Sequence, residues 1–210
     1  MFKIGVGPSS SHTVGPMVAA LEFRRLASKK LVELSKVVKS GAGKTPSKTQ
    51  SKNAAKAQYE LTVELFGSLS LTGKGHQTDG AICAGLAGLN PKSSPIDDIW
   101  SMQARLDEKP LLDFGGIAVR FCPKDDISWL QWQMDEKPLP HPNTLRFRLK
   151  EGEEIVFEEI ILSVGGGFIE PVDAKTGERR PAGTPGKVDA DTQIPYPYNS
   201  AQEYVEQCNK

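Results

Sequence analysis

Two of the three histidines lie in short segments rich in glycine, serine and threonine, a setting that suits proton transfer. His12 stands in residues 7–13 (GPSSSHT), and His76 stands in residues 73–79 (GKGHQTD). An imidazole changes its protonation near neutral pH, and nearby hydroxyl and free backbone N–H groups can bind a carboxylate or an oxyanion. The pattern therefore indicates acid–base chemistry on a small anionic substrate. The alternative is that the serines cap helices and both histidines are ordinary surface residues.

Other glycine-rich stretches do not predict a nucleotide site. Residues 73–75 (GKG) lack the G-x-x-x-x-G-K-[ST] frame of a phosphate-binding loop, and no G-x-G-x-x-G opens a helix after a predicted strand. Residues 165–167 (GGG) follow a predicted strand and indicate a close approach of the backbone. His141 stands between two prolines and is interpreted as a loop residue. The candidate chemistry therefore depends on His12 and His76.

The charge of the chain is unevenly distributed. The 210 residues include 26 basic and 26 acidic ones, but residues 24–56 hold ten basic residues and one acidic residue, a net charge of +9. This tract has no interleaved aromatic residues and no nucleic-acid recognition motif. Residues 39–58 are therefore interpreted as a flexible, solvated basic insertion, and no nucleic-acid partner is expected. Nucleic-acid binding through this insertion remains a rival hypothesis, which a salt-sensitive gel shift would test.

Several classes of protein are excluded. No window approaches 18 consecutive apolar residues, which excludes a transmembrane helix. The first residues lack the apolar core of a signal peptide, so we expect a cytoplasmic protein without a membrane partner. The three cysteines are Cys83, Cys122 and Cys208, an odd and widely spaced set that forms neither a disulfide framework nor a C-x-x-C pair. We therefore expect no metal ligands in this chain.

The candidate residues must be positioned by an α+β domain. Hydrophobic periodicity and turn residues predict helices at 17–35, 80–89, 96–106 and 201–207, and strands at 59–66, 116–121, 144–150 and 154–164. Pro16 opens the first helix, and Thr78 or Asp79 is expected to cap the second. Residues 5–16 and 67–77 are interpreted as loops. The expected fold is α-β-α-β-β-β, a single sheet with helices on one face.

Three ordered motifs make the sequence resemble a known family. Residues 2–17 (FKIGVGPSSSHTVGPM), 66–79 (FGSLSLTGKGHQTD) and 163–168 (SVGGGF) resemble signatures of the iron–sulfur-dependent L-serine dehydratases. The resemblance implies that residues 1–170 are the β, or N-terminal, domain of such an enzyme. Its fold is similar to the allosteric substrate-binding domain of some phosphoglycerate dehydrogenases. Residues 171–210 are then expected to be a linker and the start of the family's α domain.

The resemblance implies an elimination reaction in amino-acid catabolism and gluconeogenesis. In the family, a [4Fe-4S] cluster acts as a Lewis acid on the hydroxyl of L-serine while a base removes the Cα proton. Water leaves, and the aminoacrylate hydrolyses to pyruvate and ammonia. His76 is the expected base, with His12 as a second catalytic candidate and Thr78 orienting the base or the substrate. The residues expected to bind the substrate carboxylate and amino group are Ser9, Ser10, Ser11, Thr13 and Lys74.

The resemblance also implies which partners this chain has. The cysteines that ligate the cluster belong to the α domain, so the 210-residue chain is expected to hold no cluster and to be inactive alone. Its expected partners are L-serine, an α domain or α subunit, and further copies of itself in a homo-oligomer. The alternative is a stand-alone, non-catalytic domain that senses serine or a related hydroxy acid.

Overall fold

The computed structural model describes residues 5–40, 57–130, 132–135, 137–173, 176–180 and 200–208. Most of the predicted basic insertion, 39–58, lies outside these residues. The chain divides into two units, residues 1–180 and 181–210. The second unit contains helix α6 (Ala201–Cys208), close to the predicted 201–207. Among the described residues, no helix combines the length and apolar character that crossing a membrane requires.

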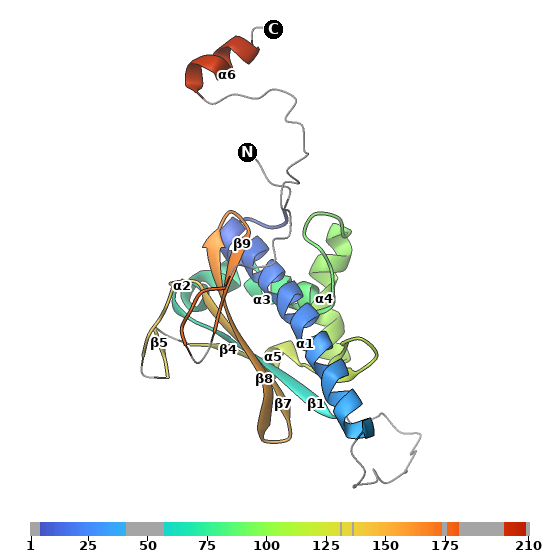
Figure 1. Cartoon of the computed structure of the whole chain (residues 1–210). Coiled ribbons are helices and arrows are strands. Elements are labelled where there is room, and N and C mark those ends of the chain that lie inside the picture. The colour runs from blue at the N-terminus through green and yellow to red at the C-terminus, as the bar shows by residue number, and fades with distance from the viewer. Residues whose placement is uncertain are drawn as a thin grey trace. The chain divides into compact units, whose positions relative to one another are not determined.

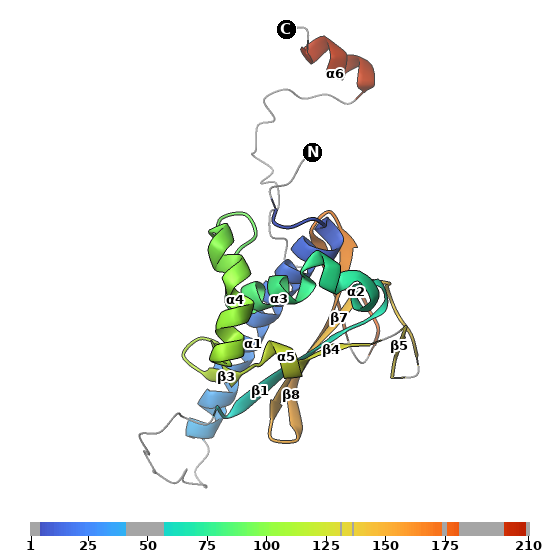
Figure 2. The same ribbon diagram turned by 180° about the vertical axis from the view of Figure 1, so that it is seen from behind.

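The helical elements of the first unit include one long N-terminal helix and several shorter ones. They are η1 (Ser10–Val14, a π-helical turn), α1 (Gly15–Ser40), α2 (Gly67–Thr72), η2 (Gly73–His76, a 3-10 turn), α3 (Thr78–Leu86), α4 (Ile96–Glu108) and α5 (Pro123–Asp126). Helix α3 packs against α1, and α4 packs against α3 (Figures 1 and 2). Helix α1 itself packs against the sheet through β8 and β9.

The strands form one main open sheet and a small separate ribbon. They are β1 (Tyr59–Leu65), β2 (Leu111–Asp113), β3 (Ala118–Arg120), β4 (Ile127–Trp129), β5 (Gln133–Met134), β6 (Lys137–Pro138), β7 (Thr144–Glu151), β8 (Glu154–Gly165) and β9 (Phe168–Val172). The sheet order is β2-β3-β1-β7-β8-β9, with β4 also paired to β1. Strand β1 is parallel to β3 and β4, whereas the other pairs are antiparallel.

The core lies between α1 and the sheet. Buried residues of α1 recur every three or four positions, which is the period of one helical face; they include Met17, Ala20, Phe23, Ala27 and Leu31. The ring of Phe23 stacks on Phe147 of β7 with centroids 4.8 Å apart, and on Phe157 of β8 at 5.6 Å. This contact fixes α1, and with it the N-terminal segment that carries His12, on the sheet.

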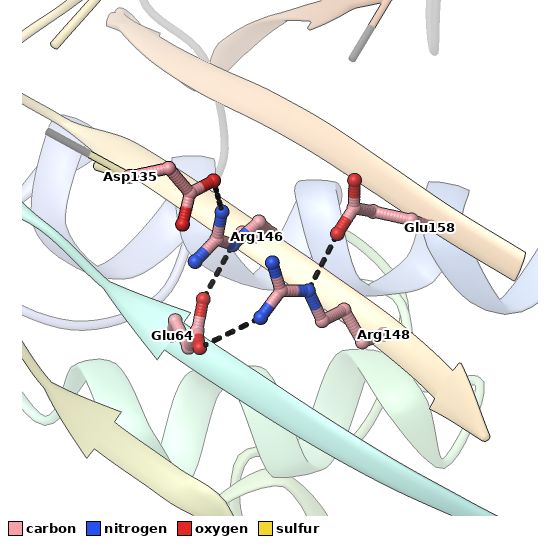
Figure 3. A network of polar contacts seen from close by, with 5 residues as sticks. All are labelled: Glu64, Asp135, Arg146, Arg148 and Glu158. Atoms are coloured by element: carbon pink, nitrogen blue, oxygen red, sulfur yellow. Dashed lines mark hydrogen bonds and ion pairs between the residues drawn. The ribbon is translucent and has the colours of Figure 1, made fainter. Parts of the chain in front are cut away.

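The opposite face of β7 carries a network of charged side chains (Figure 3). Arg146, whose side chain is only 5% exposed, donates to Glu64 of β1 and to Asp135. Arg148 donates to the other oxygen of Glu64 at 3.2 Å and to Glu158 of β8 at 2.5 Å. A nearly buried guanidinium needs such partners because an unpaired buried charge is costly. The network therefore joins β1, β7 and β8 on the face that α1 does not cover.

The α+β class with one main open sheet is confirmed, but the predicted element order was too simple. The prediction of a loop at 67–77 was wrong, because this segment forms α2 and η2. Leu69 is fully buried there, so tertiary packing orders a segment whose composition is that of a loop. The prediction of a loop at 5–16 was also partly wrong, because η1 continues directly into α1. Strand β9 was not predicted.

Candidate functional site

The two histidine segments meet in the structure. His12 lies in η1, immediately before α1, and His76 is the last residue of η2, before α3. Their imidazole rings have centroids 4.9 Å apart and are tilted by 40°. Both side chains are partly exposed. The structure thus brings together the two histidines that the sequence singled out, and leaves both within reach of solvent.

Two buried threonines hold the histidine segments together by reciprocal hydrogen bonds. The hydroxyl of Thr13 donates to the backbone carbonyl of His76 at 2.8 Å. The hydroxyl of Thr78 donates to the backbone carbonyl of His12 at 2.5 Å. Both threonines are 0% exposed. Because each bond ties one segment to the backbone of the other, the pair fixes the two backbone segments that carry the imidazoles next to each other.

The imidazole of His12 lies between two serine hydroxyls. Its Nδ1 is 2.9 Å from Oγ of Ser11, and its Nε2 is 2.9 Å from Oγ of Ser68. Oγ of Ser9 accepts the backbone N–H of His12 at 3.1 Å, which caps η1. A neutral imidazole donates through one nitrogen and accepts through the other, and a hydroxyl does either. Both nitrogens of a neutral His12 are therefore satisfied by the protein.

Burial lowers the pKa of His12 below 6.5, and the nearby His76 lowers it further, against an opposing hydrogen bond from Ser68. We expect His12 to titrate below pH 6.5 when its Cε1 proton is followed by NMR. In His76→Asn its pKa should rise but stay below 6.5, since burial is the larger cause. The unfolded chain binds this proton more tightly, so the free energy of unfolding should fall as pH drops from 6.5 towards the folded pKa. A wild-type His12 titrating at or above 6.5 would contradict this account.

His76 has a different partner. Its Nδ1 lies 2.9 Å from the backbone carbonyl oxygen of Thr72 in α2. A carbonyl oxygen only accepts hydrogen bonds, so Nδ1 carries the proton in this contact. The other nitrogen, Nε2, then holds a lone pair in the neutral ring. A ring nitrogen with a lone pair can accept a proton.

The remaining predicted site residues lie around this centre in different ways. Ser10 is exposed, and its carbonyl accepts the N–H of Gly15. Lys74 is exposed, and its Nζ lies 5.4 Å from the centre of the Trp129 ring. A cation over an indole face gains a modest electrostatic attraction. Lys74, two residues before His76 in the sequence, is therefore held by the Trp129 ring.

The sequence did not single out Ser68 or Ser163, which both contact the N-terminal segment. Ser163 stands in β8, inside the motif at 163–168, and its hydroxyl donates to the carbonyl of Ser11 at 2.7 Å. Gly15 makes room for this contact, because a Cβ built on it would lie 1.9 Å from Oγ of Ser163. Three segments distant in sequence therefore meet around the residues next to His12: η1 itself, the α2–η2 pair and the end of β8.

The described residues offer no ligand set for a metal or cluster. Within them, no three His, Cys, Asp or Glu side chains are grouped so that they could hold a metal ion. Cys83 is buried in α3, and burial raises the pKa of its thiol, which disfavours the thiolate that binds metals. Cys122 is partly buried, and Cys208 lies in the separate C-terminal unit.

Comparison with known proteins gives a consistent result over the whole chain. A family model described as the serine dehydratase beta chain matches residues 1–174. L-serine dehydratase 1 of Escherichia coli (strain K12) is 35% identical over 213 residues, and L-serine dehydratase 2 of the same strain is 34% identical over 212. The L-serine dehydratase of Haemophilus influenzae is 32% identical over 213 residues. Each match covers 100% of this chain but only 39% of the relative.

Proposed function

Because the chain belongs to the serine dehydratase beta-chain family, we propose that it supplies the β part of an L-serine ammonia-lyase, which converts L-serine to pyruvate and ammonia. One observation carries the proposal. His76 donates from Nδ1 to the Thr72 carbonyl and so keeps a lone pair on Nε2, next to a second histidine whose pKa is lowered. A base of this kind suits removal of a carbon-bound proton next to a carboxylate.

In the proposed reaction, Nε2 of His76 accepts the Cα proton of L-serine. The lone pair on Nε2 becomes an N–H bond, the C–H electrons form the double bond, and the Cβ–O bond breaks with its electron pair on the oxygen. The leaving oxygen takes up a proton in exchange for the Cα proton now on His76 and departs as water. His12 is proposed to stay neutral and to exchange protons with the hydroxyls beside it. Its lowered pKa supports this, since a neutral imidazole both donates and accepts. Thr13, which the resemblance assigned to substrate binding, is instead proposed to act with Thr78 as a positioning residue, because both hydroxyls are fully buried and donate to the carbonyls of the two histidines.

Substrate binding is assigned to the groups around the histidines. Ser9, Ser10 and Ser11 would hold the carboxylate and amino group of serine through hydroxyl and backbone N–H groups. The exposure of Ser10 and the partial exposure of Ser11 support this role. Lys74 would add positive charge for the carboxylate after leaving the Trp129 face.

We propose that the complete enzyme carries a [4Fe-4S] cluster whose ligands lie outside this chain. When bound, such a cluster supplies a Lewis acid for the serine hydroxyl. Its ligands are proposed to come from an α domain or α subunit. A homo-oligomer, a cytoplasmic location and a role in amino-acid catabolism and gluconeogenesis belong to the same proposal.

The 210-residue chain alone is expected to form no pyruvate from L-serine, because the Lewis acid and the rest of the site lie elsewhere. Calorimetry should also detect no serine binding by the chain alone. Pyruvate release by the purified chain would contradict the proposed division of labour. Tight serine binding without turnover would instead favour the sensing domain as its function.

A further inference from the structure

Helix α2 contacts both histidines. Ser68 and Thr72 are four residues apart, so they lie one turn apart on the same side of the helix. Oγ of Ser68 is 2.9 Å from Nε2 of His12, and the carbonyl of Thr72 is 2.9 Å from Nδ1 of His76. The hydroxyl of Thr72 also donates to the carbonyl of Ser68 at 3.0 Å. Two positions one helical turn apart therefore contact the two imidazoles, Ser68 through its side chain and Thr72 through its backbone carbonyl.

The contacts of Thr72 with His76 and of Ser68 with His12 differ in how they restrict the position of the ring proton. The carbonyl of Thr72 only accepts, so it selects the His76 tautomer with hydrogen on Nδ1. The hydroxyl of Ser68 both donates and accepts, as does that of Ser11 on the other nitrogen of His12. A proton can therefore be on either nitrogen of His12 without loss of a hydrogen bond. One histidine is fixed in its tautomer, and the other is free to exchange it.

The position of α2 is itself firmly set. Gly67 opens the helix with a φ of +56°, and a Cβ built on it would lie 2.4 Å from the carbonyl oxygen of Pro142. The N–H groups of Phe66 and Ser68 donate to the carbonyls of Thr144 and Pro142 at 3.0 and 2.8 Å. Only glycine combines this backbone conformation with such a close approach. The helix that addresses the histidines is thus anchored to the segment before β7.

We propose that α2 is the positioning element of the site: the carbonyl of Thr72 fixes His76 as the Nδ1–H tautomer with Nε2 as its proton-accepting atom, and Ser68 is a positioning residue that orients His12. The relevance of this proposal to catalysis rests on the proposed function. The tautomer of His76 and the orientation of His12 can be measured without substrate.

The test is a long-range ¹H–¹⁵N NMR experiment on the ¹⁵N-labelled 210-residue chain, which distinguishes protonated from lone-pair ring nitrogens. Wild type should show a protonated Nδ1 and a lone-pair Nε2 for His76 at a pH where the ring is neutral. Ser68→Ala should shift the ring nitrogens of His12 and leave the tautomer of His76 unchanged. Ser70→Ala, on the same helix, is the matched control and should change neither. Gly67→Ala, which displaces α2, should disturb both histidines.

Two spectroscopic results would overturn the proposal. One is a neutral His76 that carries its proton on Nε2, and the other is a Ser68→Ala variant in which the ring-nitrogen signals of His12 do not shift. In the complete enzyme, Ser68→Ala should lower kcat about tenfold, as expected for the loss of one net hydrogen bond, with little change in KM. Ser68→Thr should restore most of the loss, and an unchanged kcat in Ser68→Ala would also overturn it. If the tautomers are as stated but the complete wild-type enzyme does not act on serine, the proposed function fails and the positioning of the imidazoles stands.

Discussion

Replacing His76 by glutamine in the complete enzyme is expected to lower kcat for L-serine by about 10²–10⁴-fold, the range typical of a lost general base. The glutamine side chain has no basic nitrogen to replace the lone pair on Nε2. KM should change much less, because the proposed role of His76 lies in the transition state rather than in substrate binding. Steady-state pyruvate release at saturating and limiting serine separates these two quantities.

The substitution should not unfold the site, since Thr13 is bonded to the backbone carbonyl at position 76 and not to the ring. Thermal unfolding of His76→Gln checks this directly. His141→Gln is the matched control: His141 lies in the segment before β7 and its ring accepts the N–H of Asn143. It should keep kcat within about threefold, because the glutamine carbonyl oxygen can accept the same N–H. A His76→Gln enzyme that is folded and as active as this control would remove His76 from the mechanism.

Replacing Phe23 by alanine is expected to lower the free energy of unfolding by about 3–5 kcal/mol, as for other fully buried aromatic residues. The side chain is 0% exposed and stacks on Phe147 and Phe157, so its removal leaves a cavity between α1 and the sheet. Since α1 continues from η1, the loss also loosens the element that carries His12.

Urea denaturation of the 210-residue chain measures this loss as a lower midpoint. Val32→Ala is the matched control on the same helix, because Val32 is 37% exposed. Its effect should stay below about 1 kcal/mol. A loss of less than about 1 kcal/mol for Phe23→Ala would mean that α1 is not held on the sheet by this stack.

The long, periodic elements could be predicted from the sequence. Helix α1 has an apolar residue every three or four positions, and β1, β7 and β8 are rich in residues that favour strands. Each of these patterns lies within one segment and extends over enough residues that a few residues that do not fit it do not hide it. The two histidine segments could be selected as well, because their composition is unusual on its own.

Helix α2 could not be predicted in the same way. Its six residues, GSLSLT, are too few for a periodic signal, and the glycine and serines favour a loop. The helix forms because Leu69 is buried and because Pro142 and Thr144 supply acceptors for its first N–H groups. Ser68 was missed with it, since its role follows from a contact with His12, which is 56 positions earlier in the sequence.

The short strands were missed for a related reason. Strands β2 and β4 have three residues each, and exist because β3 and β1 provide partners. Strand β9 contains Pro171, which argues against a strand from sequence alone. It is the last strand in the sheet order, where proline is tolerated, and its Ile169 and Val172 are buried.

The central claim is that His76 removes the Cα proton of serine, and the deuterium isotope effect on kcat/KM with 2-deuterated L-serine tests it most directly. The measurement compares the complete wild-type enzyme with His76→Gln. Without its base, proton removal becomes the slowest step, so the isotope effect should be larger in the variant than in the wild type. An isotope effect of unity in a variant with reduced kcat/KM would contradict the claim, because the lost step would then not be cleavage of the C–H bond.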